Sequence, residues 1–161
     1  LADPAACYLH SGALTIDGQG FVFVGHSEAG KSTTMQLVRS VLGDRTEILC
    51  DDRNIVRRWP EGFRVHGTWS HGDIPEVSSA SAPVRAILFL EQHRLNEIIA
   101  LTDRKIIWER LLATLIKPLV TAEWWNKEMD LLETLVDEVP FYTMRFDKSG
   151  AVVPLLEPLV T

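Results

Sequence analysis

A lysine and three hydroxyl side chains follow a glycine-rich stretch near the start of the chain. Residues 21–34 read FVFVGHSEAGKSTT, in which Gly25, Gly30, Lys31 and Ser32 match the pattern G-x-x-x-x-G-K-[S/T]. The backbone N–H groups of such a loop converge on a phosphate, and the helix that follows adds the positive end of its dipole. Lys31 would reach the β- and γ-phosphates, and the Ser32 hydroxyl would hold Mg²⁺. The pattern predicts a site for ATP or ADP; a glycine turn that only joins a strand to a helix is the alternative.

One acid lies in the middle of this loop, where an anion is expected. Because phosphate is bound there mainly by backbone N–H groups, the Glu28 side chain can point to solvent. A second hypothesis is that Glu28 faces the acceptor, where it would repel an anionic acceptor or bind a cationic one. The whole predicted nucleotide site comprises Gly25, His26, Ser27, Glu28, Ala29, Gly30, Lys31, Ser32 and Thr33.

Two adjacent acids follow the next apolar stretch, residues 47–50. Asp51, together with Ser32, is the candidate ligand of the magnesium shell, and Asp51 or Asp52 could accept a proton from an attacking hydroxyl. We therefore name Lys31 and both aspartates as candidate catalytic residues; a solvated turn is the alternative for the acids. Glu91, which ends the run VRAILFLE, competes with them as an acid that polarises a water in a plain NTPase.

The stretch HGTWSHGD, residues 66–73, is the second unusual motif. Neither a Cys nor a third His lies nearby in sequence, so zinc is not expected. We expect this loop to shape the substrate side of the site, with Trp69 as an apolar wall; a surface loop without a role is the alternative. Several arginines could bind a γ-phosphate or an anionic substrate, although lone arginines are usually solvated: Arg53, Arg57, Arg58, Arg94 and Arg104.

Apolar periodicity and turn residues predict the elements that position these side chains. A hairpin over residues 13–16 and 21–24 leads into the loop, and a helix over residues 31–42, ending at Gly43, follows it. The other predicted elements are strands 47–50, 84–90 and 141–146, a hairpin over 54–59 and 63–66 with a three-residue turn, a loop over 67–83, and helices 103–116 (capped by Thr102) and 122–136. Together they predict an α/β fold, a mixed sheet with antiparallel hairpins and flanking helices.

Length and composition bound the class of protein. The 161 residues predict one domain, residues 1–161, and the chain begins with Leu, which suggests the C-terminal part of a longer protein. A formal net charge of −6 argues against a nucleic-acid surface. No apolar run reaches the ~18–20 residues of a membrane span, and two cysteines make no disulfide framework, so we expect a cytoplasmic protein.

Several blocks of the chain resemble the HPr serine kinase-like group of P-loop proteins. The blocks are HSGALTIDGQGFVFVGHSEAGKSTT, ILCDDRNIVRR, GFRVHGTWSHGD and APVRAILFLEQHRLNEI, and the resemblance covers residues from about 10 to 146. This group is related to the C-terminal catalytic domain of HPr kinase/phosphorylase and, more distantly, to phosphoenolpyruvate carboxykinases. The resemblance implies a P-loop kinase fold of that type, with Gly25, Gly30, Lys31 and Ser32 for phosphates and Mg²⁺ and Asp51 or Asp52 as base.

The same resemblance implies an ATP-dependent phosphotransferase that moves the γ-phosphoryl group to a serine-type hydroxyl, and an assembly of several copies. The chain departs from the bifunctional HPr enzymes, because it lacks their Glu-Ile-Arg-Gly-Ile-Gly-type stretch after the acids. We therefore interpret it as a stand-alone relative whose acceptor is open: a protein serine, a peptide or free serine. A nucleotide-binding or NTPase regulatory module without an acceptor is the second interpretation. A degenerate scaffold is disfavoured by the intact Lys31 and Ser32.

Overall fold

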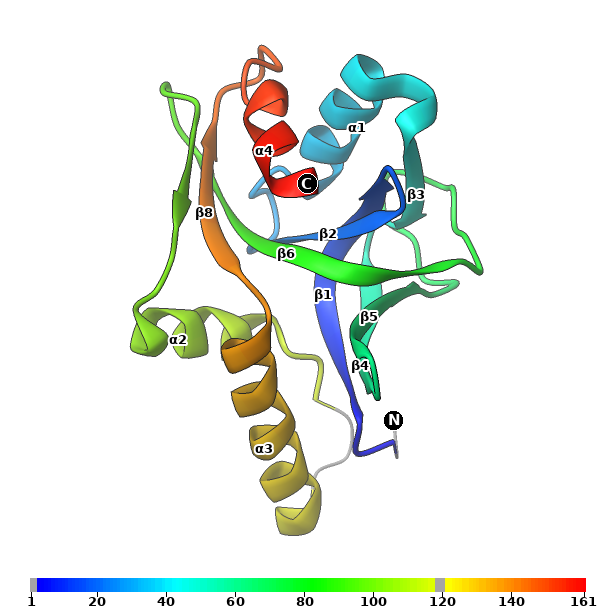
Figure 1. Ribbon diagram of the computed structural model, residues 1–161, viewed down its shortest axis with the longest axis vertical. Helices are drawn as coiled ribbons and strands as arrows, with labels where there is room; N and C mark the ends of the chain where they lie inside the picture. Colours follow the sequence, from blue (N-terminus) through cyan, green and yellow to red (C-terminus); the bar gives the residue numbers. More distant parts are fainter. Residues whose placement is uncertain (1–2, 118–120) are drawn as a thin grey trace.

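The computed structural model describes residues 3–117 and 121–161, and these form a mixed α/β structure (Figure 1). The strands are β1 (Ala6–Ile16), β2 (Gln19–Val24), β3 (Thr46–Cys50), β4 (Arg53–Trp59), β5 (Gly62–Gly67), β6 (Ser81–Gln92), β7 (Glu97–Ala100) and β8 (Phe141–Phe146). The α-helices are α1 (Lys31–Leu42), α2 (Arg104–Thr114), α3 (Ala122–Glu138) and α4 (Glu157–Val160), with short 3₁₀ turns at Gly43–Arg45 and Val153–Leu156.

The strands pair into a mixed sheet in the order β2-β1-β4-β5-β6-β8-β7. β3 pairs with the C-terminal part of β1, residues 13–16. β2 is antiparallel to β1 and parallel to β6, so the pairings β1-β4-β5-β6-β2 close into a ring. β6 is also parallel to β8, while β7 is an antiparallel edge strand. The mixed sheet with antiparallel hairpins that the sequence predicted is thus confirmed.

Two hairpins have turns that their residues explain. Between β1 and β2, Asp17 and Gly18 both have positive φ, 50° and 79°, as two-residue turns matched to strand twist require. Between β4 and β5 the turn is Pro60 and Glu61 alone. The expected three-residue turn is wrong, because Gly62 already pairs with Trp59 in the ladder.

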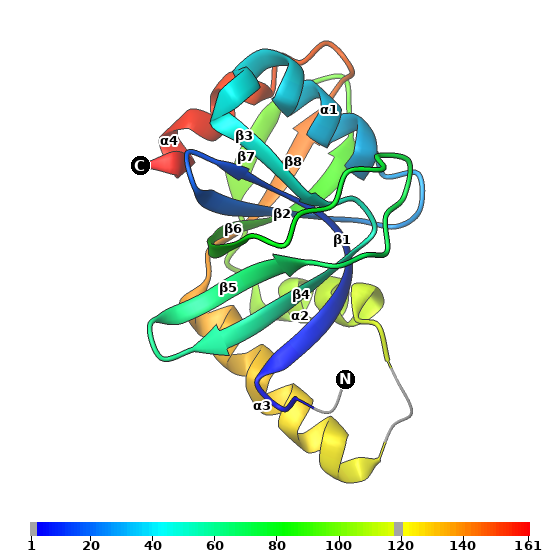
Figure 2. The same cartoon turned by 90° about the vertical axis from the view of Figure 1, so that its right-hand side faces the viewer.

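The helices cover both faces of the central strands (Figures 1 and 2). Phe21 and Phe23 of β2 pack in one core cluster with side chains of α1, and α4 packs against that cluster. Val22 and Val24 point the other way, into a cluster with α2 and α3. β2 is therefore buried on both sides, and the loop that follows it starts from a rigid strand.

Other features also differ from the sequence-based expectations. β1 begins at Ala6, seven residues before the predicted strand 13–16. β6 is longer than residues 84–90, and both β7 and the C-terminal helical segment were missed. β7 has only four residues, too few for a clear alternating pattern. The N-cap of α2 is Asp103, not Thr102, because the Asp103 carboxylate accepts from the N–H groups of Lys105 and Ile106.

Within the residues that the structure describes, no helix combines the length and the apolar content needed to cross a membrane. Both cysteines, Cys7 and Cys50, are free and buried there.

Candidate functional site

The glycine-rich loop, residues 25–30, runs from the end of β2 to the first turn of α1. Both of its glycines are sterically required. A Cβ on Gly25 would lie 2.5 Å from the Ala29 methyl group, and Gly30, with φ +96°, would place one 2.9 Å from the Phe146 ring. Glu28 also has a left-handed backbone, φ 71°, although it is not a glycine. The left-handed backbone of Glu28 therefore costs the loop some local strain.

Lys31, the first residue of α1, lies folded against the same loop. Its side chain is buried, with 8% exposed, and Nζ donates to the carbonyl oxygens of Gly25 at 2.8 Å and His26 at 3.1 Å. Burial lowers the pKa of Lys31, and the negative charges of Asp51 and Asp52 partly oppose that change. A buried ammonium group that is held only by neutral carbonyls is well placed to receive an anion.

The two adjacent aspartates after β3 bond to different partners. Asp51 is 3% exposed, and both of its carboxylate oxygens lie within hydrogen-bond distance of the Ser32 hydroxyl, at 2.9 and 2.8 Å. The N–H of Ile74 donates to Oδ2 of Asp51 at 2.8 Å. The hydroxyl and the carboxylate are hard oxygen donors of the kind that Mg²⁺ takes alongside phosphate and water oxygens, so they fit this ion.

Asp52 points toward β1 and the loop after β5. Its Oδ1 lies 3.0 Å from Nε2 of His10, and its Oδ2 accepts from the Ser70 hydroxyl at 3.2 Å. Arg53 forms an ion pair with the same Oδ2, with Nε at 3.2 Å. The carboxylate remains 26% exposed. Asp52 is thus the more accessible acid of the pair, with three polar partners, while Asp51 is the buried one.

Only some residues of the HGTWSHGD stretch lie at the site. Ser70 and Asp73 reach the site, the first through Asp52 and the second as part of the hollow beside Lys31. His66 instead accepts from the Trp59 indole at 3.3 Å, and its pKa is lowered by burial and by Arg64 and Arg57. Trp69 has 86% of its surface exposed.

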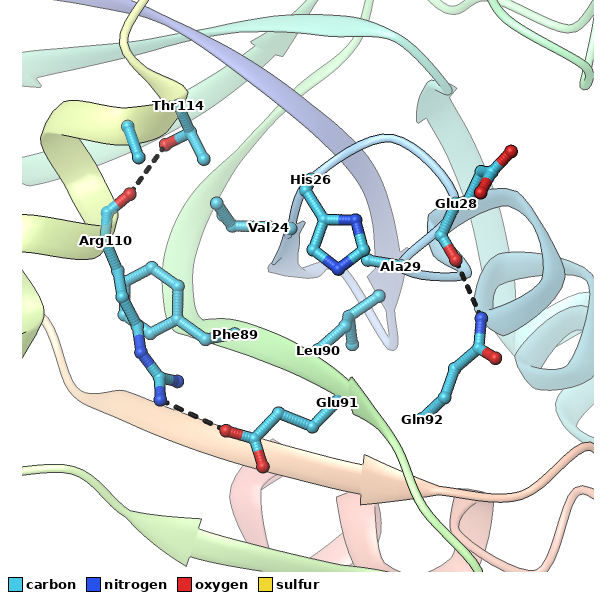
Figure 3. A pocket seen from close by; sticks show the side chains of 12 residues that line it. Val24, His26, Glu28, Ala29, Phe89, Leu90, Glu91, Gln92, Arg110 and Thr114 are labelled. Atoms are coloured by element: carbon cyan, nitrogen blue, oxygen red, sulfur yellow. Dashed lines mark hydrogen bonds and ion pairs between the residues drawn. The ribbon is translucent and has the colours of Figure 1, made fainter.

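Two hollows flank the glycine-rich loop. The smaller, about 360 Å³, surrounds the start of α1 and is lined by Glu28, Gly30, Lys31, Ser32, Thr33, Asp73, Gln92 and Lys148. The larger, about 700 Å³, lies between the loop, the end of β6 and α2 (Figure 3). Glu28 and Gln92 line both, and the Gln92 amide donates to the Glu28 carbonyl at 2.7 Å. Ser27 is exposed and lines neither hollow.

Glu91, the competing acid, is held by two arginines. Arg110 donates to its Oε1 at 3.1 Å and Arg145 to its Oε2 at 2.9 Å, and Arg145 also bonds Glu97 at 2.8 Å. The hydrogen bond from Arg145 is the main cause that lowers the pKa of Glu91; burial opposes it. A carboxylate with such partners is a weak proton acceptor.

Of the candidate arginines, Arg53 contacts a site residue, Asp52, at 3.2 Å, and three others pair with acids elsewhere. Arg57, Arg58 and Arg104 form ion pairs with Asp3, Glu138 and Asp137. Four residues near the site were not singled out from the sequence: His10, Gln92, Arg110 and Lys148. The polar ending of the apolar run, Glu91-Gln92, was a usable signal for Gln92, whereas the others reach the site only through long-range packing.

Comparison with solved structures shows a relationship of fold. A structure described as "Structure of the Hpr(Ser) kinase/phosphatase from Coxiella burnetii" matches with a TM-score of 0.53 and 12% identity, over 95% of this chain and 87% of that chain. No protein-family model matches the chain, and no curated protein matches it by sequence. At that identity the likeness supports a distant relationship in fold: this chain is similar in architecture to an HPr(Ser) kinase/phosphatase.

Proposed function

We propose that this chain is a Mg²⁺-dependent phosphotransferase that moves the γ-phosphoryl group of ATP to a serine-type hydroxyl, on a P-loop kinase fold of the HPr kinase type. The observation that carries the proposal is the contact of Ser32 with Asp51 beside the buried Lys31. It joins the hydroxyl of a G-x-x-x-x-G-K-S loop to a buried carboxylate 19 residues further along the chain.

The roles divide between the two aspartates. Lys31 would turn from the Gly25 and His26 carbonyls to the β- and γ-phosphates, and Ser32 and Asp51 would hold the magnesium shell. When bound, Mg²⁺ would neutralise charge that develops on the phosphate oxygens. Asp52 would accept the proton of the acceptor hydroxyl as its oxygen bonds to the γ-phosphorus and the bond to the β-γ bridging oxygen breaks, which releases ADP.

The second interpretation, an NTPase without an acceptor, needs an acid that orients water. Glu91 is the candidate, but its two arginine partners occupy its carboxylate. Asp52 has one arginine partner, Arg53, where Glu91 has two, and its other carboxylate oxygen lies beside His10; its side chain is 26% exposed, against 34% for Glu91. The arrangement therefore favours transfer to a hydroxyl over hydrolysis.

The test is incubation with γ-labelled ATP, Mg²⁺ and a panel of serine-containing proteins, peptides and free serine. We expect Lys31→Ala to weaken ATP binding at least tenfold. We expect Asp52→Asn to keep ATP affinity within about threefold and to lower transfer by 10²–10⁴-fold, the usual worth of a general base. Glu76→Gln, which changes an exposed acid paired with Arg39, is the matched control.

Two results would contradict the proposal. One is an ATP affinity that does not change in Lys31→Ala. The other is ATP hydrolysis that survives Asp51→Asn and Asp52→Asn but is lost in Glu91→Gln, which would favour the NTPase.

A further inference from the structure

The hairpin of β4 and β5 has one face that the chemistry just described does not use. Val56, Phe63 and Val65 are buried in the core cluster that includes side chains of α2 and α3. The residues that alternate with them point the other way, and in Figure 2 the two strands lie in front of α2. This outward side, here called the β4-β5 face, consists of six half-buried or exposed side chains: Arg53, Ile55, Arg57, Trp59, Arg64 and His66.

The β4-β5 face is basic, although the whole chain has a formal net charge of −6. Three of its six side chains are arginines, and none is an aspartate or a glutamate. Cross-strand pairing places Arg57 directly opposite Arg64, so two positive charges lie next to each other near the centre of the face. Like charges opposite one another on neighbouring strands repel, and an anionic partner would relieve that repulsion.

The chain itself neutralises these two central arginines only weakly. Arg64 donates to the hydroxyl and the carbonyl oxygen of Ser81, at 3.1 and 2.9 Å, and both groups are uncharged. Arg57 pairs with Asp3 at 2.7 Å, and its guanidinium lies 4.1 Å from the centre of the Trp59 ring. The side chains of the Arg57–Asp3 pair are 30% and 36% exposed. Because ion pairs so open to solvent add little stability, another carboxylate can take the place of Asp3.

The β4-β5 face begins at the proposed catalytic base. Arg53, the first residue of β4, forms an ion pair with Asp52 at 3.2 Å. His10, which pairs with Arg53 across the two strands, lies 3.0 Å from the other carboxylate oxygen of Asp52. Arg57 follows further along β4, about 13 Å away at about 3.3 Å per residue. An extended peptide laid along β4 with a hydroxyl at Asp52 would therefore bring a residue about four positions away to Arg57 and Arg64.

We propose that the β4-β5 face is the docking surface for the phosphoryl acceptor, and that the acceptor is an acidic segment of a protein. Its serine lies at Asp52, and carboxylates about three to five residues away pair with Arg57 and Arg64. This inference rests on the proposed function, because the serine must lie near the base. It also narrows the acceptor, since free serine is too small to reach from Asp52 to the two arginines.

Arginine and tryptophan side chains also bind single-stranded nucleic acid. Such a strand carries a negative charge at every nucleotide, and it would meet Asp52 at one end of the face as well as a chain of net charge −6. A protein segment can instead carry its acids only where the arginines lie. The charge distribution therefore favours the protein segment.

The test measures binding and transfer separately, with three fluorescent peptides of about eleven residues that share a central serine. One has glutamates about three to five residues from the serine on both sides, one has glutamines at the same places, and one has lysines. By fluorescence anisotropy at about 0.05 M salt, we expect the glutamate peptide to bind about tenfold or more tightly than the glutamine peptide. That preference should fall below about threefold at about 0.5 M salt, because salt screens exposed charges. A benzophenone on the glutamate peptide should label residues 53–66 of the unmodified chain.

The variant Arg57→Gln/Arg64→Gln removes both central charges. We expect it to bind the glutamate and glutamine peptides within about twofold of each other, and to raise KM for the glutamate peptide about tenfold or more. Its kcat and ATP affinity should stay within about twofold. Arg39→Gln/Arg104→Gln, which removes two exposed arginines paired with acids on other elements, is the control of equal charge and should keep the preference. Arg57→Glu/Arg64→Glu should prefer the lysine peptide.

Four outcomes would overturn the inference. They are equal binding of the glutamate and glutamine peptides, a preference that survives Arg57→Gln/Arg64→Gln, tighter binding of a single-stranded DNA oligonucleotide through the same arginines, and an assembly of chains that this variant dissociates. The last would make the face a contact between copies. A failure of the proposed function looks different: the glutamate peptide then binds through the arginines, but no phosphoryl group passes from labelled ATP to its serine.

Discussion

The side-chain amide of Gln92 donates a hydrogen bond of 2.7 Å to the main-chain carbonyl of Glu28, and Glu28 has a left-handed backbone with φ 71°. The bond joins the end of β6 to the middle of the glycine-rich loop, 64 residues away in sequence. An interaction made through the main chain leaves the Glu28 side chain exposed. The hydrogen bond uses only the main chain of Glu28, so any residue that tolerates positive φ could make it.

Replacement of Glu28 by glycine tests whether the side chain has a role. A left-handed backbone costs a non-glycine residue about 1–2 kcal/mol, and the greater freedom of glycine in the unfolded chain offsets about 0.5–1 kcal/mol of that. We expect Glu28→Gly to raise the free energy of unfolding by up to about 1 kcal/mol in urea titrations. ATP affinity and acceptor KM should each stay within about twofold. A changed acceptor KM with the same ATP affinity would instead support a Glu28 that faces the acceptor.

Removal of the Asp51 carboxylate should abolish the effect of magnesium. The Ser32 hydroxyl and Asp51 are the oxygen donors that fit the ion, and Asp51→Asn keeps the shape of the side chain while removing its charge. We expect Mg²⁺ to strengthen ATP binding about tenfold or more in the unmodified chain and by less than twofold in Asp51→Asn. Titrations with Mg²⁺ and with EDTA measure the difference. Asp44→Asn, at an exposed acid, should retain the full magnesium effect.

Trp69 should contribute to recognition of the acceptor. It is 86% exposed, and the next residue, Ser70, bonds to Asp52 at 3.2 Å, so Trp69 is one residue away from a contact of the proposed base. We expect Trp69→Ala to raise acceptor KM at least fivefold, with the unfolding free energy within about 0.5 kcal/mol because little surface is buried. Leu95→Ala, at another exposed apolar residue, is the control. An acceptor KM that responds equally to both changes would count against this role.

Glu128 of α3 should make stability depend on pH. It is 1% exposed, its Oε1 has no hydrogen-bond partner among the described residues, and burial raises its pKa from 4.5 to about 7. Below pH 4.5 the carboxyl group is protonated in both folded and unfolded chains, so its ionisation does not change the free energy of unfolding. As pH rises from 4.5 to 7 only the unfolded chain ionises, and stability is lost; above 7 the loss is complete.

We therefore expect Glu128→Gln to be more stable than the unmodified chain at pH 8 by about 2–3 kcal/mol, and equal to it near pH 4. Urea unfolding at a series of pH values between 4 and 8 measures the difference. Glu133→Gln, at an exposed acid on the same helix, should give no such pH-dependent gain. A constant difference between the Glu128 variant and the unmodified chain over this range would show that Glu128 does not titrate as described.

Local patterns in the sequence were enough to predict the elements on either side of the glycine-rich loop. Strand β2, the loop and α1 are contiguous, and the predicted bounds of α1, including its end at Gly43, agree with the structure. Alternation of apolar residues and helical spacing arise from the geometry of a single segment, which the sequence displays directly. The candidate residues Gly25, Gly30, Lys31 and Ser32 are near one another for the same reason.

Only the tertiary structure determined which side chains these residues contact. Ser32 reaches Asp51 because β3 pairs with β1, and Asp52 reaches His10 across 42 residues because β1 also continues beside β4. These contacts separate a buried aspartate from an accessible one, although the two are adjacent and chemically identical in the sequence. The larger hollow likewise exists only because α2 packs against β6, bringing Arg110 to Glu91. Strand order and helix placement depend on the combined burial of many side chains that are far apart in the sequence. A local pattern describes one segment only, so it does not determine this arrangement.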